Sequence, residues 1–267
     1  MAEIMQVAQS RGADSDAPHL WRGLVGAWPL QEGGGNRIWD VSGSRNHGTL
    51  YGNDIGAAWG LAFFGRHLRC NGNDVYVLGN PVGSITKSRG WSVSAWVRQR
   101  FVGTGDNQYP RIVNSVDNQL KWLIALGDSS LWAAYNDGTE YRREGDALTL
   151  NQWHHVVAVF SANGIAGVTL YINGRLVTTD RDPGRVNWAN TGLYFGRRGD
   201  GQQRLNGDLC DVLIYDYTLS QAAITSLYAD PWAMYRLRHK IHPAIVAALP
   251  PTVTQRRSQL LGSGLGV

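Results

Sequence analysis

The sequence Gly-Trp-Ser-Val-Ser-Ala-Trp-Val at residues 90–97 decides the fold of this chain. Successive side chains of a β-strand point to opposite faces of a sheet. The odd positions from Trp91 to Val97 are therefore expected on one face, with Trp96 on the other. Such alternation is typical of a strand that packs one face against a hydrophobic core.

Similar apolar stretches recur on both sides of this one, at a spacing of roughly 8–12 residues, with almost no helical period among them. Asn71-Gly72 and Asn173-Gly174 each separate two stretches, and Asn-Gly is a strong turn signal. So many strands exceed one open sheet, and we predict an all-β fold of two packed antiparallel sheets. The expected strands cover residues 24–30, 49–51, 59–64, 66–70, 75–78, 91–97, 111–116, 121–126, 131–135, 153–160, 168–172, 193–196 and 209–215.

The two ends of the chain differ from this middle part. Residues 1–20 are polar and small without periodicity, which indicates an N-terminal arm. One short C-terminal helix is expected at residues 221–228, and it stops before Pro231. Residues 231–267 show no core face and are interpreted as a C-terminal extension. The segment between them, residues 21–230, is expected to be one sandwich domain.

Composition narrows the class of protein. Of the 267 residues, 43% are hydrophobic, which is enough for a sizeable core. No stretch approaches the roughly 20 apolar residues of a membrane span, and the N-terminus lacks the apolar stretch of a signal peptide. Synthesis and assembly in a cytoplasm are therefore expected. The two cysteines, Cys70 and Cys210, are then expected to be free thiols, with one buried disulfide between them as the alternative.

The charge is mildly basic, with a formal net charge of +4 and a pI of about 9.2. Nucleic-acid binding usually comes with clustered Lys and Arg, whereas most arginines here are scattered. Nucleic acid is therefore not expected as a partner. The alternative is DNA binding by a basic tail, which would use Arg236, Arg238, His239, Lys240, Arg256 and Arg257.

Five segments in order resemble motifs of the laminin-G-like, concanavalin A-like superfamily, in its bacterial and viral branch. They are LVGAWPLQEG at 24–33, DVSG at 40–43 with NHGTL at 46–50, GWSVSAWV at 90–97, WHHV at 153–156 followed by LYING at 170–174, and LNGDLCDVLIY at 205–215. Their order and spacing match the family across most of the chain. The resemblance implies a jelly-roll sandwich of two curved sheets.

Most aromatic and histidine residues in these motifs are expected to be structural. Tryptophans at strand positions fill the space between sheets, and we expect this of Trp28, Trp91 and Trp96. His154 and His155 are neighbours on a strand and face opposite ways, so they cannot form one catalytic or metal pair.

The resemblance also implies a structural calcium ion near one turn and the last strand. Asp40 and Asn46 match the turn, and Asp211 matches the second acid of a pair on the final strand. Calcium prefers several oxygen ligands, whereas Cys210 replaces the first acid of that pair. We expect no cofactor, with calcium at Asp40, Asn46 and Asp211 as the open alternative.

Related folds include glucanases, which use two carboxyl groups close together on one sheet face. Glu140 and Glu144 would share a strand face, but arginines lie between them, and ion pairing with those arginines is the favoured explanation. The sequence contains no P-loop, no Gly-x-Ser-x-Gly elbow and no zinc-ligand spacing. We therefore predict that the chain is not an enzyme.

The first functional hypothesis is a virion structural protein, a capsid decoration or minor head or tail protein. Residues 227–236 resemble the tail that follows the sandwich in many phage-encoded laminin-G-like proteins, and the arms suit capsid neighbours or self-association within the particle. The expected anchoring residues are Trp232, Met234, Tyr235 and Arg236. Alternatively, Trp232 and Tyr235 pack back onto their own sandwich. The expected location is the virion, after assembly in the host cytoplasm.

The second hypothesis is a carbohydrate-binding module that recognises glycans, including those of a host surface. Members of the superfamily commonly bind glycans with exposed aromatic residues on a sheet or an edge loop. The candidates in this chain are Tyr109, Trp132, Tyr135, Asn136, Tyr141 and Trp188. The two hypotheses are compatible, because a sandwich on a virion surface could also bind glycans.

Overall fold

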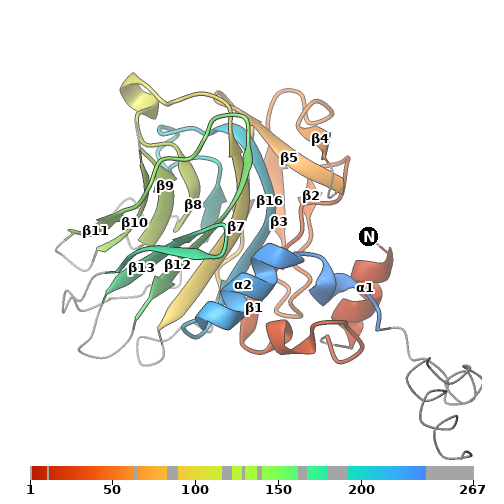
Figure 1. The fold of residues 1–267 in the computed structure, drawn as a ribbon. Coiled ribbons are helices and arrows are strands. Elements are labelled where there is room, and N and C mark those ends of the chain that lie inside the picture. Colours follow the sequence, from red (N-terminus) through yellow and green to blue (C-terminus); the bar gives the residue numbers. More distant parts are fainter. Residues whose placement is uncertain are drawn as a thin grey trace, which may run out of the picture. The chain divides into compact units, whose positions relative to one another are not determined.

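The computed structural model describes residues 2–10, 12–62, 65–82, 90–115, 122–127, 130–136, 140–161, 167–179 and 192–238. All the helices and strands described belong to one compact unit that ends at Leu237. Within it, two antiparallel sheets, each of eight described strands, pack face to face (Figure 1). The predicted all-β jelly-roll sandwich is confirmed.

The first sheet is built around a long central strand, β16. Its strand order is β14 (Arg175–Thr179), β13 (Val168–Ile172), β12 (Trp153–Phe160), β7 (Trp91–Gln99), β16 (Asn206–Tyr215), β5 (Gly65–Asn71) and β4 (Trp59–Ala62), and β1 (Leu24–Trp28) also pairs with β16. Along one edge, β16 therefore pairs with two different strands, β5 and β1. Residues 206–209 pair with β5, and residues 212–215 pair with β1. Between these halves the register shifts, and Asp211 has a φ of 49°, so the bulge redirects the strand from one partner to the other.

The second sheet faces the first across the core. Its strand order is β11 (Glu140–Glu144), β10 (Leu131–Asn136), β9 (Trp122–Leu126), β8 (Arg111–Ser115), β15 (Leu193–Phe195), β6 (Tyr76–Gly79), β3 (Gly48–Tyr51) and β2 (Arg37–Ile38). A short 3-10 helix, η2 (Gly105–Asn107), lies in the connection between β7 and β8.

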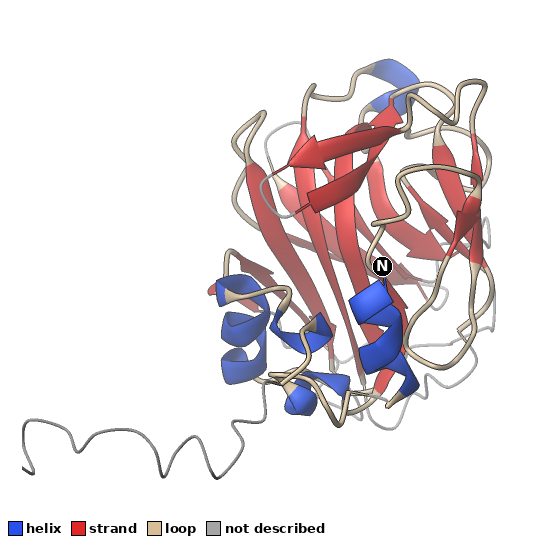
Figure 2. Ribbon diagram, turned by 90° about the vertical axis from the view of Figure 1, so that its right-hand side faces the viewer, coloured by secondary structure: helices blue, strands red, loops and turns tan. Residues whose placement is uncertain are grey.

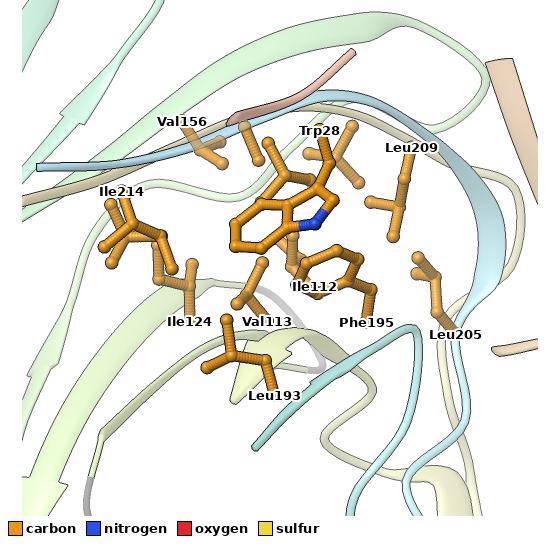
Figure 3. Packing of buried hydrophobic residues seen from close by; sticks show 14 of the residues in the cluster. Trp28, Ile112, Val113, Ile124, Val156, Leu193, Phe195, Leu205, Leu209 and Ile214 are labelled. Carbon is orange, nitrogen blue, oxygen red and sulfur yellow. The ribbon is translucent and has the colours of Figure 1, made fainter. Parts of the chain in front are cut away.

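Trp28 lies at the centre of the core between the two sheets (Figure 3). It is fully buried, and its ring meets Phe195 edge-on at a centroid distance of 5.1 Å. Gly26 makes room for the ring, because a Cβ at that position would lie 2.5 Å from it. Trp91 is also buried and stacks on Phe160 at 4.7 Å. The predicted core roles of both tryptophans are confirmed.

A layer of helices covers part of the outer face of the first sheet (Figure 2). It contains α1 (Ala2–Gln9), η1 (Pro18–Trp21), α2 (Gln221–Ala229) and η3 (Ala233–Tyr235). Their apolar side chains form a second hydrophobic cluster with outward residues of the sheet such as Val157 and Tyr215. Trp96 belongs to this outer side, where its ring stacks on Tyr228 of α2 at 5.9 Å. It is buried, but beneath a helix and not between the sheets.

The N-terminal segment is part of this layer, which differs from the arm expected at residues 1–20. Ile4 and Val7 are buried on one side of α1, and Leu20 is buried in η1. The N–H of Asp16 also donates to the carbonyl of Arg236 at 3.0 Å, so the two ends of the described chain are joined. The apolar residues here are too few for a periodic signal, and the contact with η3 is what gives them a core.

The two cysteines are free and buried, as expected. Burial raises the pKa of both Cys70 and Cys210, which keeps the thiols protonated. None of the helices that the structure describes is both long and apolar enough to cross a membrane.

Candidate functional site: a tyrosine platform

The outer face of the second sheet carries tyrosines on three neighbouring strands, β3, β6 and β15. Alternation along each strand explains their direction. Leu50, Val77 and Leu193 are buried in the core, so the adjacent tyrosines point away from it. We call Tyr51, Tyr76 and Tyr194, together with Arg197, the tyrosine platform.

The tyrosine rings lie close to one another across the strands. Tyr51 and Tyr76 are directly opposite in register, and their rings stack at 5.0 Å with an interplanar angle of 8°. Tyr194 lies on the next strand, with its ring centroid 5.9 Å from that of Tyr76. Tyr51 is 41% exposed and the other two are half-buried. The result is an aromatic surface that spans three strands and faces solvent.

Arg197 lies over this surface. Gly196, with a φ of +85°, turns the chain after β15, and a Cβ there would lie 2.6 Å from the sulfur of Cys70. The turn brings the Arg197 Cζ atom to 3.3 Å from the Tyr76 ring centroid and 5.2 Å from that of Tyr194. Its Nε atom has no hydrogen-bond partner in the described part of the chain. The two tyrosine rings are therefore the contacts that hold the guanidinium among the residues that the structure describes.

The platform combines two kinds of contact. Ring faces offer apolar area, and the hydroxyl groups and the guanidinium offer hydrogen bonds. Partial burial raises the pKa of Tyr76, with the positive charge of Arg197 as a smaller opposing effect. The Tyr76 hydroxyl therefore stays protonated at neutral pH and can both donate and accept.

The glycan-binding residues predicted from the sequence fall elsewhere. Tyr109 and Trp132 do meet, edge-on at 5.4 Å. However, Trp132 is only 3% exposed, so the prediction that its ring stacks on a glycan is wrong for this structure. Tyr135 and Tyr141 are register partners on β10 and β11, but their side chains are outside the described residues, as is Trp188.

A sequence signal for the platform existed. In Thr49-Leu50-Tyr51 and Tyr76-Val77-Leu78 each tyrosine is next to a core residue in an alternating stretch. Alternation therefore placed the tyrosines on the outer face. It could not show that this part of the face would be left uncovered.

In the turn that starts at Asp40, both carboxylate oxygens accept hydrogen bonds from backbone N–H groups. Asp40 Oδ1 accepts the N–H of Ala27 and of Ser42, both at 2.9 Å, and Oδ2 accepts the N–H of Asn46 at 2.8 Å. The side-chain amide of Asn46 donates to the carbonyl of Val25 at 2.8 Å. These contacts fasten the turn to β1.

Asp211 also has a protein partner. Its Oδ1 accepts the hydroxyl of Tyr235 at 2.6 Å, and its burial raises the pKa to about 7. Among the residues described, no three His, Cys, Asp or Glu side chains group as a metal site. With N–H donors on Asp40 and a hydroxyl on Asp211, these residues do not fit the calcium ion that the family resemblance implies.

The residues expected to anchor a partner lie mainly within the fold. Met234 is fully buried and Tyr235 is 2% exposed, so the anchoring role predicted for these two is wrong in this conformation. Trp232 is half-buried against Tyr235, with ring centroids 5.4 Å apart. Arg236 is exposed and pairs with Asp16 and Asp230. Trp232 and Tyr235 therefore pack onto their own sandwich, which was the alternative prediction.

The other polar candidates are structural or are only partly described. His155 is buried, its Nε2 lies 2.8 Å from the Ser94 hydroxyl, and burial lowers its pKa to about 3. His154 instead contacts Asn173, on the opposite face of the strand. Glu144 is exposed, and the side chain of Glu140 is outside the described residues.

Comparisons with known proteins agree on the family and the fold. Residues 71–225 match the family described as the concanavalin A-like lectin/glucanases superfamily. No curated protein matches the chain at a significant level.

Among solved structures, the binding domain of Paraclostridial mosquitocidal protein 1 is 22% identical with a TM-score of 0.60, covering 80% of this chain and 53% of that one. The binding domain of botulinum neurotoxin serotype D/C is 17% identical with a TM-score of 0.62, covering 79% and 53%. That of botulinum neurotoxin DC, in complex with rat synaptotagmin II, is 18% identical with a TM-score of 0.60, covering 79% and 52%. At these identities the likeness shows the fold alone, and the chain spans about half the length of each domain.

Proposed function

Because the chain belongs to the concanavalin A-like lectin/glucanases superfamily, we propose that it is a non-catalytic recognition domain that binds glycans on the tyrosine platform. The observation that carries this proposal is the cluster of three tyrosine rings on an outward sheet face, in which Tyr51 stacks on Tyr76, Tyr194 lies tilted beside Tyr76, and Arg197 lies over the Tyr76 ring.

The platform suits a sugar for physical reasons. A sugar ring has apolar C–H faces that pack on aromatic rings, and hydroxyl groups that need both donors and acceptors. Tyrosine supplies both in a rigid side chain that loses little entropy on binding. Arg197 is already held against the rings, so its donors require little further ordering.

The test is binding of the full chain to a printed glycan array, with the Tyr76→Ala and Tyr194→Ala variants beside the wild type. Each ring removed should weaken binding by about fivefold or more, because anchoring aromatic residues contribute more than ~1 kcal/mol. Tyr228→Ala is the matched control, since Tyr228 is a 39% exposed tyrosine on α2.

Binding that is indifferent to both platform variants would refute the proposal, as would the absence of binding to any glycan. Incubation of a bound glycan with the wild type should release no product. Hydrolysis would contradict the non-catalytic assignment.

The virion role predicted from the sequence stays a separate prediction. Because Met234 and Tyr235 are buried, attachment to a capsid would need residues beyond Leu237. Of that segment the structure describes only Arg238. A chain cut after Arg238 keeps every described element and removes that segment. Co-sedimentation with purified shells that lack this protein should then require residues 239–267, and equal binding of the cut chain would contradict anchoring by them.

A further inference from the structure

A cavity of about 490 Å³ opens beside β2, at the edge of the second sheet. The loop between β1 and β2 forms most of its wall, and Met5 of α1 completes the lining. Its size is within the roughly 300–1,000 Å³ of small-molecule sites. The residues that matter for its chemistry are Glu32, Gly34, Gly35, Asn36, Arg37 and Trp39.

The cavity lies at the edge of the sheet that carries the tyrosine platform, and its lining residue Arg37 is on the platform's face. Arg37 pairs with Thr49 of β3, and Thr49 and Tyr51 share a face because Leu50 between them is buried. Arg37 and Tyr51 are therefore diagonal neighbours, which lie roughly 7–8 Å apart in an antiparallel pair. A ligand that covers Tyr51 thus comes close to the mouth of the cavity.

Two side chains at this mouth hold each other in place. The Arg37 Cζ atom lies 4.5 Å from the ring centroid of Trp39, and His47 meets the same ring edge-on at 4.9 Å. Trp39 is nevertheless 37% exposed. An apolar ring and a guanidinium donor are therefore both presented to a ligand.

The glycines keep the loop wall thin. A Cβ built on Gly34 or Gly35 would have no heavy atom within 4 Å, so open space lies beside both. Gly35 also has a φ of +70°, which a larger residue rarely adopts. No backbone carbonyl among the described residues accepts their N–H groups, which leaves two further donors in the wall.

Glu32 supplies the acceptor. Its Oε1 accepts the N–H of Trp39 at 3.0 Å, whereas its Oε2 is withdrawn from solvent and has no hydrogen-bond partner in the described part of the chain. An unpaired buried acceptor is unfavourable. A ligand hydroxyl group can reach Oε2 once the Glu32 side chain turns toward the cavity that it lines, and the new hydrogen bond would then stabilise the carboxyl group. Burial also raises the pKa of Glu32.

We propose that this cavity binds the terminal residue of a neutral glycan whose following residues lie on the tyrosine platform. A hydroxyl group both donates and accepts, so it suits Glu32 as well as Arg37. A simple anion would be repelled by Glu32, and a simple cation by Arg37. The inference rests on the proposed function and adds to it a preference for the end of a glycan chain.

The test uses the full chain and a printed panel of neutral hexasaccharides, each attached once through its reducing end and once through the opposite end. The wild type should bind in one attachment only. Glu32→Gln keeps an oxygen for the Trp39 N–H, and Gly34→Val fills the open space. Both should weaken binding by about tenfold or more. Glu144→Gln is the matched control, because Glu144 is an exposed carboxylate on β11.

Thermal unfolding of each variant shows whether it is folded, and Gly34→Val decides the result if Glu32→Gln is not. Equal binding of both attachments would overturn the terminal subsite. The terminal subsite would also be overturned if the cavity variants bound with wild-type affinity while Tyr76→Ala lost binding. That outcome would leave the tyrosine platform as the glycan-binding site. Binding indifferent to every variant, or no binding to any hexasaccharide, would overturn the platform as well.

Discussion

The buried pair of Asp211 and Tyr235 should make the stability of this domain depend on pH in a predictable direction. The pKa of Asp211 rises from its ordinary 3.8 to about 7 because the carboxyl group is buried. A pKa that is higher in the folded than in the unfolded state means that the folded state binds more protons between those two values. Stability from this group is therefore full below pH 3.8, falls as pH rises to about 7, and then stays constant.

The size of the effect follows from the same values. One pKa unit corresponds to about 1.36 kcal/mol, so ionisation of Asp211 should cost the folded state about 4 kcal/mol across the window from 3.8 to about 7. Asp211→Asn removes the titration, while its side-chain oxygen can still accept the Tyr235 hydroxyl. The variant should therefore lack this part of the decline.

The assay is urea unfolding of the wild type and Asp211→Asn at several pH values across this window. The difference in unfolding free energy between the two isolates Asp211, because all other titrating groups are common to both. Asp106→Asn, an exposed carboxylate on η2, is the control and should follow the wild type. If Asp211→Asn loses stability with pH as steeply as the wild type, then Asp211 is not protonated in the folded state and the reasoning fails.

Three further outcomes are expected. Trp28→Ala should destabilise the domain by about 3–5 kcal/mol in chemical unfolding, because the substitution leaves a cavity between the sheets. A loss below ~1 kcal/mol would contradict the central position of Trp28 in the core. Asp208→Ala should lower the free energy of unfolding by about 2–4 kcal/mol, because the buried carboxylate accepts hydrogen bonds from Arg98 at 2.6 Å and from Arg100 at 2.9 Å. An unchanged unfolding midpoint would show that the arginines find other partners. Neither EDTA nor added calcium should change Tm, because Asp40 is occupied by backbone N–H groups; a rise with calcium would show an ion there.

The strands could be predicted from the sequence because alternation and turn signals are local. Of the stretch at residues 90–97, residues 91–97 fall within β7, which runs from Trp91 to Gln99 with its odd positions inward as expected. The helical layer could not be predicted in the same way. Ile4 and Val7 become core residues only because η3, more than 200 positions later, packs against α1.

The candidate site also depends on contacts that local sequence patterns do not show. Trp132 and Tyr76 both lie on outward positions of the second sheet, and nothing local separates them. Trp132 is 3% exposed and lies beside the equally buried Arg111, whereas Tyr76 is half-buried and faces solvent. Parity along a strand therefore gives the face of a residue, but exposure depends on how other segments pack over that face.

The two outer faces of the sandwich consequently differ in how their aromatic side chains are covered. On the first sheet, aromatic side chains such as Trp96 are covered by α2, so they stabilise the attachment of the helices. On the second sheet, the rings of Tyr51, Tyr76 and Tyr194 lie side by side with no described helix over them. Aromatic area that stays at the surface does not gain the full free energy of burial, and a ligand that covers it supplies the remainder. This difference between the faces is the physical reason to look for recognition on the second sheet.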